Sequence, residues 1–248
     1  SSNNFLSTLS GQKPQTILMD AILPSNTQKM GVLGINDFRS FYAKYTDFLA
    51  KHNNLYEHNK WIQEMDKEYG VNLENTFAAI TGNELGHIST FASSGNTENY
   101  VIVQSNSEAV EMLRHLNKNI TEDPYNDTHR GVELYKIHIP DVLEKVLGNL
   151  FSAVYENYFC WIDGYLVFAN SPTALKTFIN SNLSRKTLAN NIYYQNYTES
   201  ISSKCNYLFY SNPSLNNWAS NLYKNLQDWV NVEDWSNINA FAYQLTTN

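Results

Sequence analysis

The chain has 248 residues, 42% of them hydrophobic and 14% aromatic, and a formal net charge of −7 at pH 7. This composition excludes a disordered chain, and the acidic balance without any run of Lys or Arg excludes the basic surface that nucleic acid binding requires. No apolar run approaches the ~20 residues that cross a bilayer, so we expect no direct membrane insertion of this region.

The first predicted elements follow a polar start. Residues 1–22 are expected to form a flexible N-terminal segment, and residues 23–248 a single α+β domain. The turn at Leu23–Asn26 precedes a strand over Gly31–Asn36. The 3.6-residue spacing of apolar side chains then predicts three helices. They run from Asp37 to His52, from Leu55 to Tyr69 with Gly70 as a left-handed cap, and from Asn72 to Ile80.

The central part of the chain alternates strands and helices. Alternating apolar residues indicate the strands, and turn residues separate them. The predicted order is a strand over Glu84–Ala92, a hairpin loop at Ser93–Asn96, a strand over Tyr100–Gln104, a helix capped by Ser107, a polar surface loop over Asn117–Arg130, a strand over Gly131–Ile139 and a helix from Pro140 to Gly148.

The clearest local signal is the stretch Tyr158–Pro172, in which two apolar runs flank Asp163-Gly164. This dipeptide supplies the two positive-φ positions of a type I′ turn, so the stretch predicts a tight antiparallel hairpin. Because nearly every position of both strands is apolar, we expect the hairpin to be central, with both faces covered. Ser171 and Pro172 are suited to cap and open a helix directly afterwards.

The last part of the chain returns to helices and strands. The predicted elements are a helix over Pro172–Asn182, a helix over Thr187–Glu199 with Leu188, Ile192, Tyr193 and Tyr197 on its inner side, a strand over Asn206–Ser211, a helix from Pro213 and a strand over Asn239–Thr246. The chain stops there without a cap or a polar tail, and we therefore expect it to be the N-terminal part of a longer protein.

Two weak internal echoes bear on the architecture. Residues 101–113 resemble residues 166–178, and residues 32–45 resemble residues 208–222, each as a strand that runs into a capped helix. Duplication of a strand–helix unit and convergence on a common junction both explain such matches. The order of elements predicts an α+β fold, with antiparallel sheet and helices packed on one face.

Motifs for chemistry are missing. Cys160 and Cys205 lie in apolar strands outside any C-x-x-C pattern, which favours buried thiols, and a disulfide between them requires neighbouring strands. The six histidines lack the spacing of a zinc-binding helix, so neither a metal nor a cofactor is predicted. There is no G-x-S-x-G turn and no Gly-rich phosphate loop, so no catalytic residue is assigned. The acids Asp228, Glu233 and Asp234 suit acid–base chemistry only if the fold gathers them.

Aromatic residues are the class in excess, with 17 Tyr, 12 Phe and 5 Trp. Planar rings with a polar tip suit the recognition of sugars or peptides, although most of these rings fall on stripes that pack a core. The residues that fall off those stripes are the candidate ligand-binding residues. They are Trp61, Tyr125, Tyr194 and Trp235.

Several segments resemble a family of uncharacterised exported proteins and lipoproteins of Gram-negative bacteria, described as a domain of unknown function. The segments are LPSNT at 23–27, TGNELG at 81–86, residues 157–179, TLAN at 187–190 and NYLFYSNPS at 206–214. The resemblance implies a location in the cell envelope, in the periplasm or on the outer surface, with a lipid anchor from a removed leader. It also implies a further, mostly β, region after this one, and it brings no catalytic residue.

Three functions follow as hypotheses. The leading one is a non-catalytic module that binds or organises an envelope protein or glycan and contacts a following domain of the same chain. The second is a hydrolase acting on glycans or peptides, which requires a cleft with converging carboxylates or a histidine beside a carboxylate. The third is a structural spacer for a following domain, which predicts no pocket and a large apolar face near residue 248.

Overall fold

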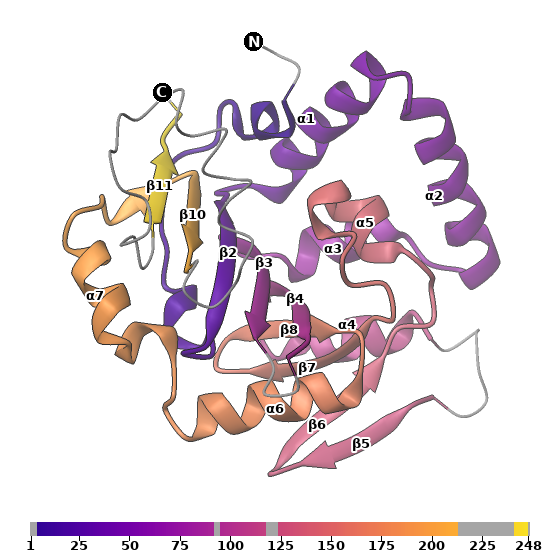
Figure 1. Cartoon of the computed structure of the whole chain (residues 1–248). Coiled ribbons are helices and arrows are strands. Elements are labelled where there is room, and N and C mark those ends of the chain that lie inside the picture. Colours follow the sequence, from indigo (N-terminus) through magenta and orange to yellow (C-terminus); the bar gives the residue numbers. More distant parts are fainter. Residues whose placement is uncertain (1–3, 92–94, 118–123, 213–240, 248) are drawn as a thin grey trace.

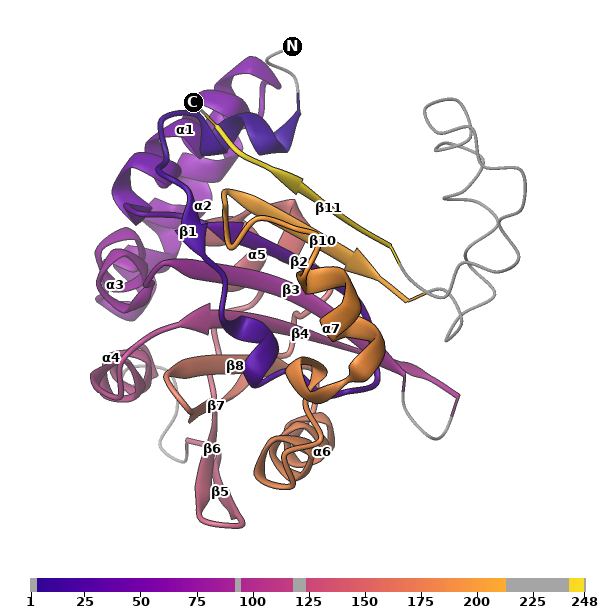
Figure 2. The ribbon, with the colours of Figure 1, turned by 90° about the vertical axis from the view of Figure 1, so that its left-hand side faces the viewer.

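The structure is a computed structural model, and it describes residues 4–91, 95–117, 124–212 and 241–247 (Figure 1). Within these residues nine strands form one antiparallel sheet in the order β11-β10-β2-β3-β4-β8-β7-β6-β5. Figure 2 shows the same order from β11 at the top to β5 at the bottom. The predicted α+β class with an antiparallel sheet is confirmed.

The bounds of the elements are as follows. The strands of the large sheet are β2 (Thr27–Gly34), β3 (Glu84–Phe91), β4 (Thr97–Gln104), β5 (Asn126–His129), β6 (Val132–Lys136), β7 (Tyr158–Ile162), β8 (Tyr165–Ala169), β10 (Tyr207–Ser211) and β11 (Phe241–Leu245). Strands β1 (Gln15–Thr16) and β9 (Lys204–Cys205) form a second sheet. The α-helices are α1 (Phe38–Lys51), α2 (Leu55–Tyr69), α3 (Leu73–Ile80), α4 (Glu108–His115), α5 (Val142–Leu147), α6 (Pro172–Leu183) and α7 (Ile192–Thr198). The 3-10 helices are η1 (Phe5–Leu9), η2 (Met19–Ala21), η3 (Asn149–Phe151) and η4 (Leu188–Asn190).

The predicted hairpin is present as β7 and β8. Ile162 pairs with Tyr165, and the two turn residues have φ angles of 49° at Asp163 and 86° at Gly164. The hairpin lies inside the sheet between β4 and β6, and every residue of β8 is buried. The Ser171 side chain then accepts a hydrogen bond from the Ala174 N–H, so the helix α6 begins where the sequence predicts it.

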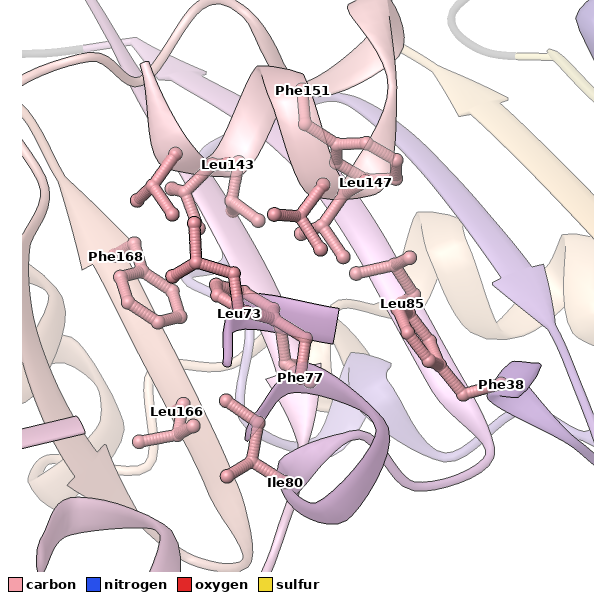
Figure 3. Close-up of a cluster of buried hydrophobic side chains, with 14 of the residues drawn as sticks. Phe38, Leu73, Phe77, Ile80, Leu85, Leu143, Leu147, Phe151, Leu166 and Phe168 are labelled. Carbon is pink, nitrogen blue, oxygen red and sulfur yellow. The ribbon is translucent and has the colours of Figure 1, made fainter. Parts of the chain in front are cut away.

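Side chains alternate between the two faces of the sheet and build two cores. On β8, Leu166 and Phe168 join the first core, whereas Tyr165 and Val167 join the second. Figure 3 shows part of the first core. Leu73, Phe77 and Ile80 of α3 lie opposite Leu143 and Leu147 of α5, over the strand residues Leu85, Leu166 and Phe168.

The helices cover both faces of the sheet, so the prediction that they pack on one face is wrong. The first core includes residues of α1, α3, α4 and α5, and the second includes residues of α6 and α7. In Figure 1, α1, α2 and α5 lie on one side of the sheet and α6 and α7 on the other. The strand pattern already indicates this arrangement, because strands that are apolar at every position must be covered on both faces.

The first internal echo does not correspond to one repeated unit in space. Strands β4 and β8 are neighbours in the sheet, yet α4 packs in the first core and α6 in the second. The same cap chemistry therefore leads the chain to opposite faces, which favours convergence over duplication. For the second echo, residues 213–222 lie outside the described residues, as does the helix predicted from Pro213.

The N-terminal residues differ from the flexible segment that the sequence predicts. Leu9 is buried in the first core, and Met19 and Ile22 are buried in the second. Polar contacts also hold this segment, since Asn206 Nδ2 donates to the Gln12 carbonyl at 3.1 Å. A few apolar residues in a polar stretch are enough to fix it when the folded sheet offers a place to bury them.

Two further predictions from the last two-thirds of the chain need correction. The predicted polar loop over Asn117–Arg130 contains β5, which ends the sheet among the described strands and lacks apolar alternation because none of its residues is buried. The helix predicted over Thr187–Glu199 is split into η4 and α7, because Asn191 caps a new helix by accepting hydrogen bonds from Tyr193 N and Tyr194 N. None of the described helices is long and apolar enough to cross a membrane.

Candidate binding groove

A groove of about 720 Å³ lies between the α1–α2 pair and the segment formed by α5 and η3. Its apolar lining comes from η1 and η3 in addition to α1, where most of the rings lie. The apolar lining residues are Phe5, Tyr45, Phe48, Leu49 and Leu150, and the charged ones are Glu57, Glu144 and Lys145. A volume of this size is in the range of ligand-binding pockets.

Helix α1 supplies the floor of the groove because its cap and its apolar spacing fix which side faces inward. Asp37 accepts a hydrogen bond from Arg39 N and begins the helix. Tyr45 and Leu49 are then buried, and Phe48 is half-buried toward the groove. At the end of α1, Asn53 has a φ angle of 60°, which turns the chain into α2.

Phe5 joins the floor from the N-terminal 3-10 helix. Its ring packs edge-on against Tyr45 and Phe48, with ring centroids 6.1 and 6.0 Å apart. Gly148 makes room for it, since a Cβ there would lie 2.5 Å from Phe5, and the φ angle of 108° at this position also favours glycine. The sequence assigned Phe5 to a flexible tail and therefore missed it as a lining residue.

His58 lies at the inner end of the groove and is only 6% exposed. Its Nε2 and the Tyr42 hydroxyl lie 2.9 Å apart in a hydrogen bond, and its ring meets Tyr45 edge-on. Burial, with a smaller contribution from the charge of Lys145, lowers the pKa of His58 to about 4. Burial, with a smaller contribution from Glu144, raises the pKa of Tyr45 to about 12. Both side chains are therefore neutral near pH 7.

The groove thus combines a neutral, aromatic floor with a charged rim. The hydrogen-bond partner of His58 is a tyrosine hydroxyl, whereas a catalytic histidine needs a partner that orients it and a nucleophile that it activates. The rim carboxylates Glu57 and Glu144 stand on different helices, α2 and α5. This arrangement suits the binding of an apolar group flanked by charge.

The described aromatic candidates from the sequence, Trp61, Tyr125 and Tyr194, do not line the groove. Trp61 is half-buried on α2 and packs against the first core. Tyr125 lines a smaller pocket of about 280 Å³ together with Arg114 and His115. Trp235 lies outside the described residues, as do the acids Asp228, Glu233 and Asp234. Neither Trp61 nor Tyr125 lines the groove.

Tyr194 is not a surface residue. It is 3% exposed and packs edge-on against Tyr210, with the ring centroids 5.1 Å apart. The new cap at Asn191 changes the phase of the helix, so Tyr194 turns inward while Ile192 and Tyr193 are each 62% exposed. The predicted inner side is therefore wrong for Ile192 and Tyr193, whereas Leu188 is buried and Tyr197 packs against the second core, as predicted.

Sequence reasoning also missed a buried carboxylate, Glu84, which is 1% exposed at the start of β3. Its Oε2 accepts hydrogen bonds from Leu18 N at 3.0 Å and Met19 N at 2.8 Å, and its Oε1 accepts one from the Tyr165 hydroxyl at 3.0 Å. Burial raises the pKa of Glu84, and the three hydrogen bonds offset this only in part. Glu84 therefore anchors η2 to the sheet.

The structure also shows the state of the two cysteines and the placement of residue types that bind metals. Cys160 and Cys205 are free, buried thiols, as the first of the two interpretations predicted. Burial raises the pKa of Cys160 to about 12, which keeps it a thiol. Among the described residues no three His, Cys, Asp or Glu side chains gather as the ligands of a metal ion would.

The segments that carry the sequence resemblance act mainly in the fold. Leu188 N donates to the Leu23 carbonyl at 2.7 Å, and Pro24 and Thr187 form a β-bridge, so the segments at 23–27 and 187–190 lie side by side. Asn206 holds the Gln12 and Gly34 carbonyls. These contacts show that residues of these segments hold distant parts of the fold together.

Comparison with known proteins gives one match. Residues 76–238, well over half of the chain, match the family described as protein of unknown function (DUF3352). The match extends from α3 past β10 and includes the hairpin β7–β8. No curated protein and no solved structure matches the chain. The chain therefore belongs to the DUF3352 family of proteins of unknown function.

Proposed function

We propose that this protein is a non-catalytic binding module whose groove between α1, α2 and α5 holds a peptide segment of a partner protein. The observation that supports it is the combination of a floor of Phe and Leu side chains with a rim that carries charge. Aromatic and aliphatic pockets of this kind accept an apolar anchor residue of a partner.

A peptide fits the groove better than a glycan. Phe5, Phe48, Leu49 and Leu150 offer no hydrogen-bonding groups, so sugar hydroxyls placed against them would lose water without gaining a partner. A peptide that places one large apolar side chain against these residues gives up fewer hydrogen bonds to water. The rim contains two carboxylates, Glu57 and Glu144, beside one amine, Lys145, which favours basic residues next to the anchor.

The test is a selection of random peptides displayed on phage against the whole chain. We expect the selected peptides to share a large apolar residue with Lys or Arg nearby. Fluorescence polarisation should show that Phe48→Ala weakens their binding about tenfold or more, and that Glu57→Lys weakens it by a smaller factor. Tyr193→Ala is the matched control, because Tyr193 is an exposed ring on α7, which packs in the second core.

Two results would oppose the proposal. One is that selection enriches no peptide; the other is that the enriched peptides bind Phe48→Ala, Glu57→Lys and Tyr193→Ala equally well. Because Phe48 also contacts Phe5, each variant is first compared with the parent chain by circular dichroism. Glu57 lies on the exposed side of α2, so Glu57→Lys remains informative if Phe48→Ala does not fold.

A hydrolase is the second candidate, favoured by the presence of Glu57, Glu144 and His58 in one groove. The hydrogen bond of His58 to Tyr42 argues against it. The same peptides distinguish the two functions, since mass spectrometry after incubation with the chain would show cleavage by a hydrolase and intact peptide with a binding module. The groove also disfavours the structural spacer, because a region that only separates two domains is expected to have no pocket.

We further propose that the protein works in the bacterial cell envelope, on the basis of its sequence resemblance to exported proteins and lipoproteins. The partner is then an envelope protein, and contact with a following domain of the same chain remains part of the proposal. Fractionation of cells that express the full-length gene tests the location. Recovery of the protein in the cytosol would contradict it.

A further inference from the structure

A polar pocket of about 440 Å³ lies where the loop after α6 meets η2 and the turn of the β7–β8 hairpin. Asn182 and Leu183 line it from the end of α6, and Arg185 lines it from the loop that follows. Ala21 of η2 and Asp163 of the hairpin turn line its other sides. None of these elements lines the groove, so the pocket is a separate site.

Turns and caps fix the walls of this pocket. The Arg185 N–H donates to the Asn182 carbonyl at 2.8 Å and closes the end of α6. Asn190 Nδ2 donates to the Arg185 carbonyl at 3.0 Å and to Thr187 Oγ1 at 3.1 Å. Asp163 is held in the tight turn of the hairpin. The backbone that carries the polar groups is therefore ordered before a ligand arrives, which lowers the cost of binding.

Asn182 is a polar residue at a position where the helix pattern predicts core. It continues the buried stripe of α6 that includes Phe178 and Ile179, and it is only 7% exposed. Its side-chain amide forms no hydrogen bond with a described residue. The amide is not sealed inside the protein, as the unpaired Oδ1 of Asn157 is, and it lines the pocket. Because buried amides are nearly always paired, we expect a molecule in the pocket to supply the partner.

The pocket also contains two opposite formal charges that are not used within the protein. Asp163 and Arg185 line it together, yet neither side chain forms an ion pair or a hydrogen bond with any residue of the described chain. A ligand that carries both charges complements this arrangement. A simple carboxylate would leave Asp163 unpaired, and a simple amine would leave Arg185 unpaired. The guanidinium fork also suits a carboxylate, which it can bind with two parallel hydrogen bonds.

The rest of the lining favours an amino acid over a sugar. No described lining residue is an aromatic ring against which a sugar could pack. The apolar contact comes from Leu183, which is 45% exposed beside the polar groups and can cover an aliphatic side chain. The volume corresponds to roughly 15 water molecules at liquid density, which is room for one amino acid.

We propose that this pocket binds a zwitterionic α-amino acid with an aliphatic side chain. Its carboxylate lies at Arg185, its ammonium group at Asp163 and its side chain against Leu183, and the amide of Asn182 supplies a further hydrogen bond. The proposal is independent of the peptide binding proposed for the groove, because the two sites share no lining residue.

The test titrates the whole chain with leucine at constant ionic strength, and with acetate, methylamine and glucose as comparison ligands. Ligand-observed nuclear magnetic resonance should show that leucine binds with a Kd on the order of 1 mM or tighter, and that each comparison ligand binds about tenfold more weakly or not at all. Arg185→Gln and Asp163→Asn should each weaken leucine binding about tenfold or more. Arg185→Lys should weaken it by a smaller factor, because it keeps the charge and loses the fork.

Arg130→Gln and Asp141→Asn are the matched controls. Both residues have positive φ angles, of 51° and 56°, as Arg185 and Asp163 do, and neither lines the pocket. Each control removes the same charge from a similar backbone conformation elsewhere in the chain. Leucine binding should therefore be the same in both controls as in the parent chain.

Three outcomes would overturn the proposal. They are no binding of leucine, binding of acetate, methylamine or glucose as tight as that of leucine, and unchanged leucine binding in Arg185→Gln and Asp163→Asn. Circular dichroism checks the fold of each variant. If Arg185→Gln does not fold, Asp163→Asn decides alone, because asparagine tolerates the φ angle of 49° in the hairpin turn.

Discussion

At the scale of single residues, the fold places ionisable side chains where they must be neutral or strongly hydrogen-bonded. His58 is held against Tyr42 and Tyr45, and Glu84 is held by two backbone N–H groups and a tyrosine. The alternation around Glu84 gave no sign of a buried acid. The reason is that its partners, Leu18, Met19 and Tyr165, are distant in sequence.

His58 should make the protein less stable in acid. The pKa of His58 is about 4 in the folded state and near 6.5 in the unfolded state, so only the unfolded state gains this proton as the pH falls from 7 toward 4. We expect the free energy of unfolding to fall over this window by about 1–3 kcal/mol through His58. Urea denaturation at pH 7 and pH 4.5 measures it, and His58→Gln should reduce the loss. Equal losses of stability in His58→Gln and the parent would show that the imidazole of His58 is protonated in the folded state.

Glu84 should have the opposite pH dependence. Its pKa is raised by burial, so the folded state holds a proton longer than the unfolded state, and this contribution to stability is lost as the pH rises from about 4.5 through the raised pKa. Glu84→Gln should remove this loss. Glu84→Ala leaves the N–H groups of Leu18 and Met19 and the Tyr165 hydroxyl unpaired, which should cost about 2–4 kcal/mol of unfolding free energy by urea denaturation. A cost below that of Glu84→Gln would contradict this role.

At the scale of the elements, local sequence predicts those whose ends are marked by caps and turns. Asn72 caps α3, and Gly70 ends α2 in the left-handed conformation, both as predicted. The misses are β5 and the boundary between η4 and α7. Strand β5 was missed because it is polar and lies at the edge of the described sheet. The boundary between η4 and α7 was missed because Asn191 caps a new helix within an apolar pattern that predicts one continuous helix.

The turn of the β7–β8 hairpin gives a prediction at this scale. Gly164 has a φ angle of 86°, and a Cβ there would meet no atom within 4 Å, so the cost of Gly164→Ala comes from the backbone alone. We expect it to destabilise the protein by about 1 kcal/mol in thermal or urea denaturation. Asp163→Asn, which tolerates its φ of 49°, should be near neutral. Equal stability of Gly164→Ala and the parent would show that the turn has another conformation.

At the scale of the whole molecule, one sheet joins two cores. Each central strand contributes alternate side chains to both cores. Unfolding of one core would therefore disturb the strands on which the other core is built. This arrangement supports the prediction of a single domain over residues 23–248, which we keep as a prediction. It also ties the groove, which lies over the first core, to the packing of the second.

Unfolding should accordingly be one cooperative transition. Leu166→Ala removes a side chain of the first core and Leu175→Ala one of the second, and each should cost about 2–5 kcal/mol. In both variants, far-ultraviolet circular dichroism and fluorescence should give coincident urea transitions. Two separate transitions, one sensitive to each variant, would show that the cores unfold independently.

The sequence by itself determined the local features: the helices with marked caps, the type I′ hairpin, the buried thiols and the antiparallel α+β class. These depend on backbone preferences and on side-chain periods within about ten residues. Only the tertiary structure decided the order of the strands, the face on which each helix packs, the burial of the N-terminal residues and the two cavities. Each of these depends on contacts between residues far apart in the chain, such as Lys29 with Ser89 or Phe5 with Gly148, whose partners no local pattern identifies.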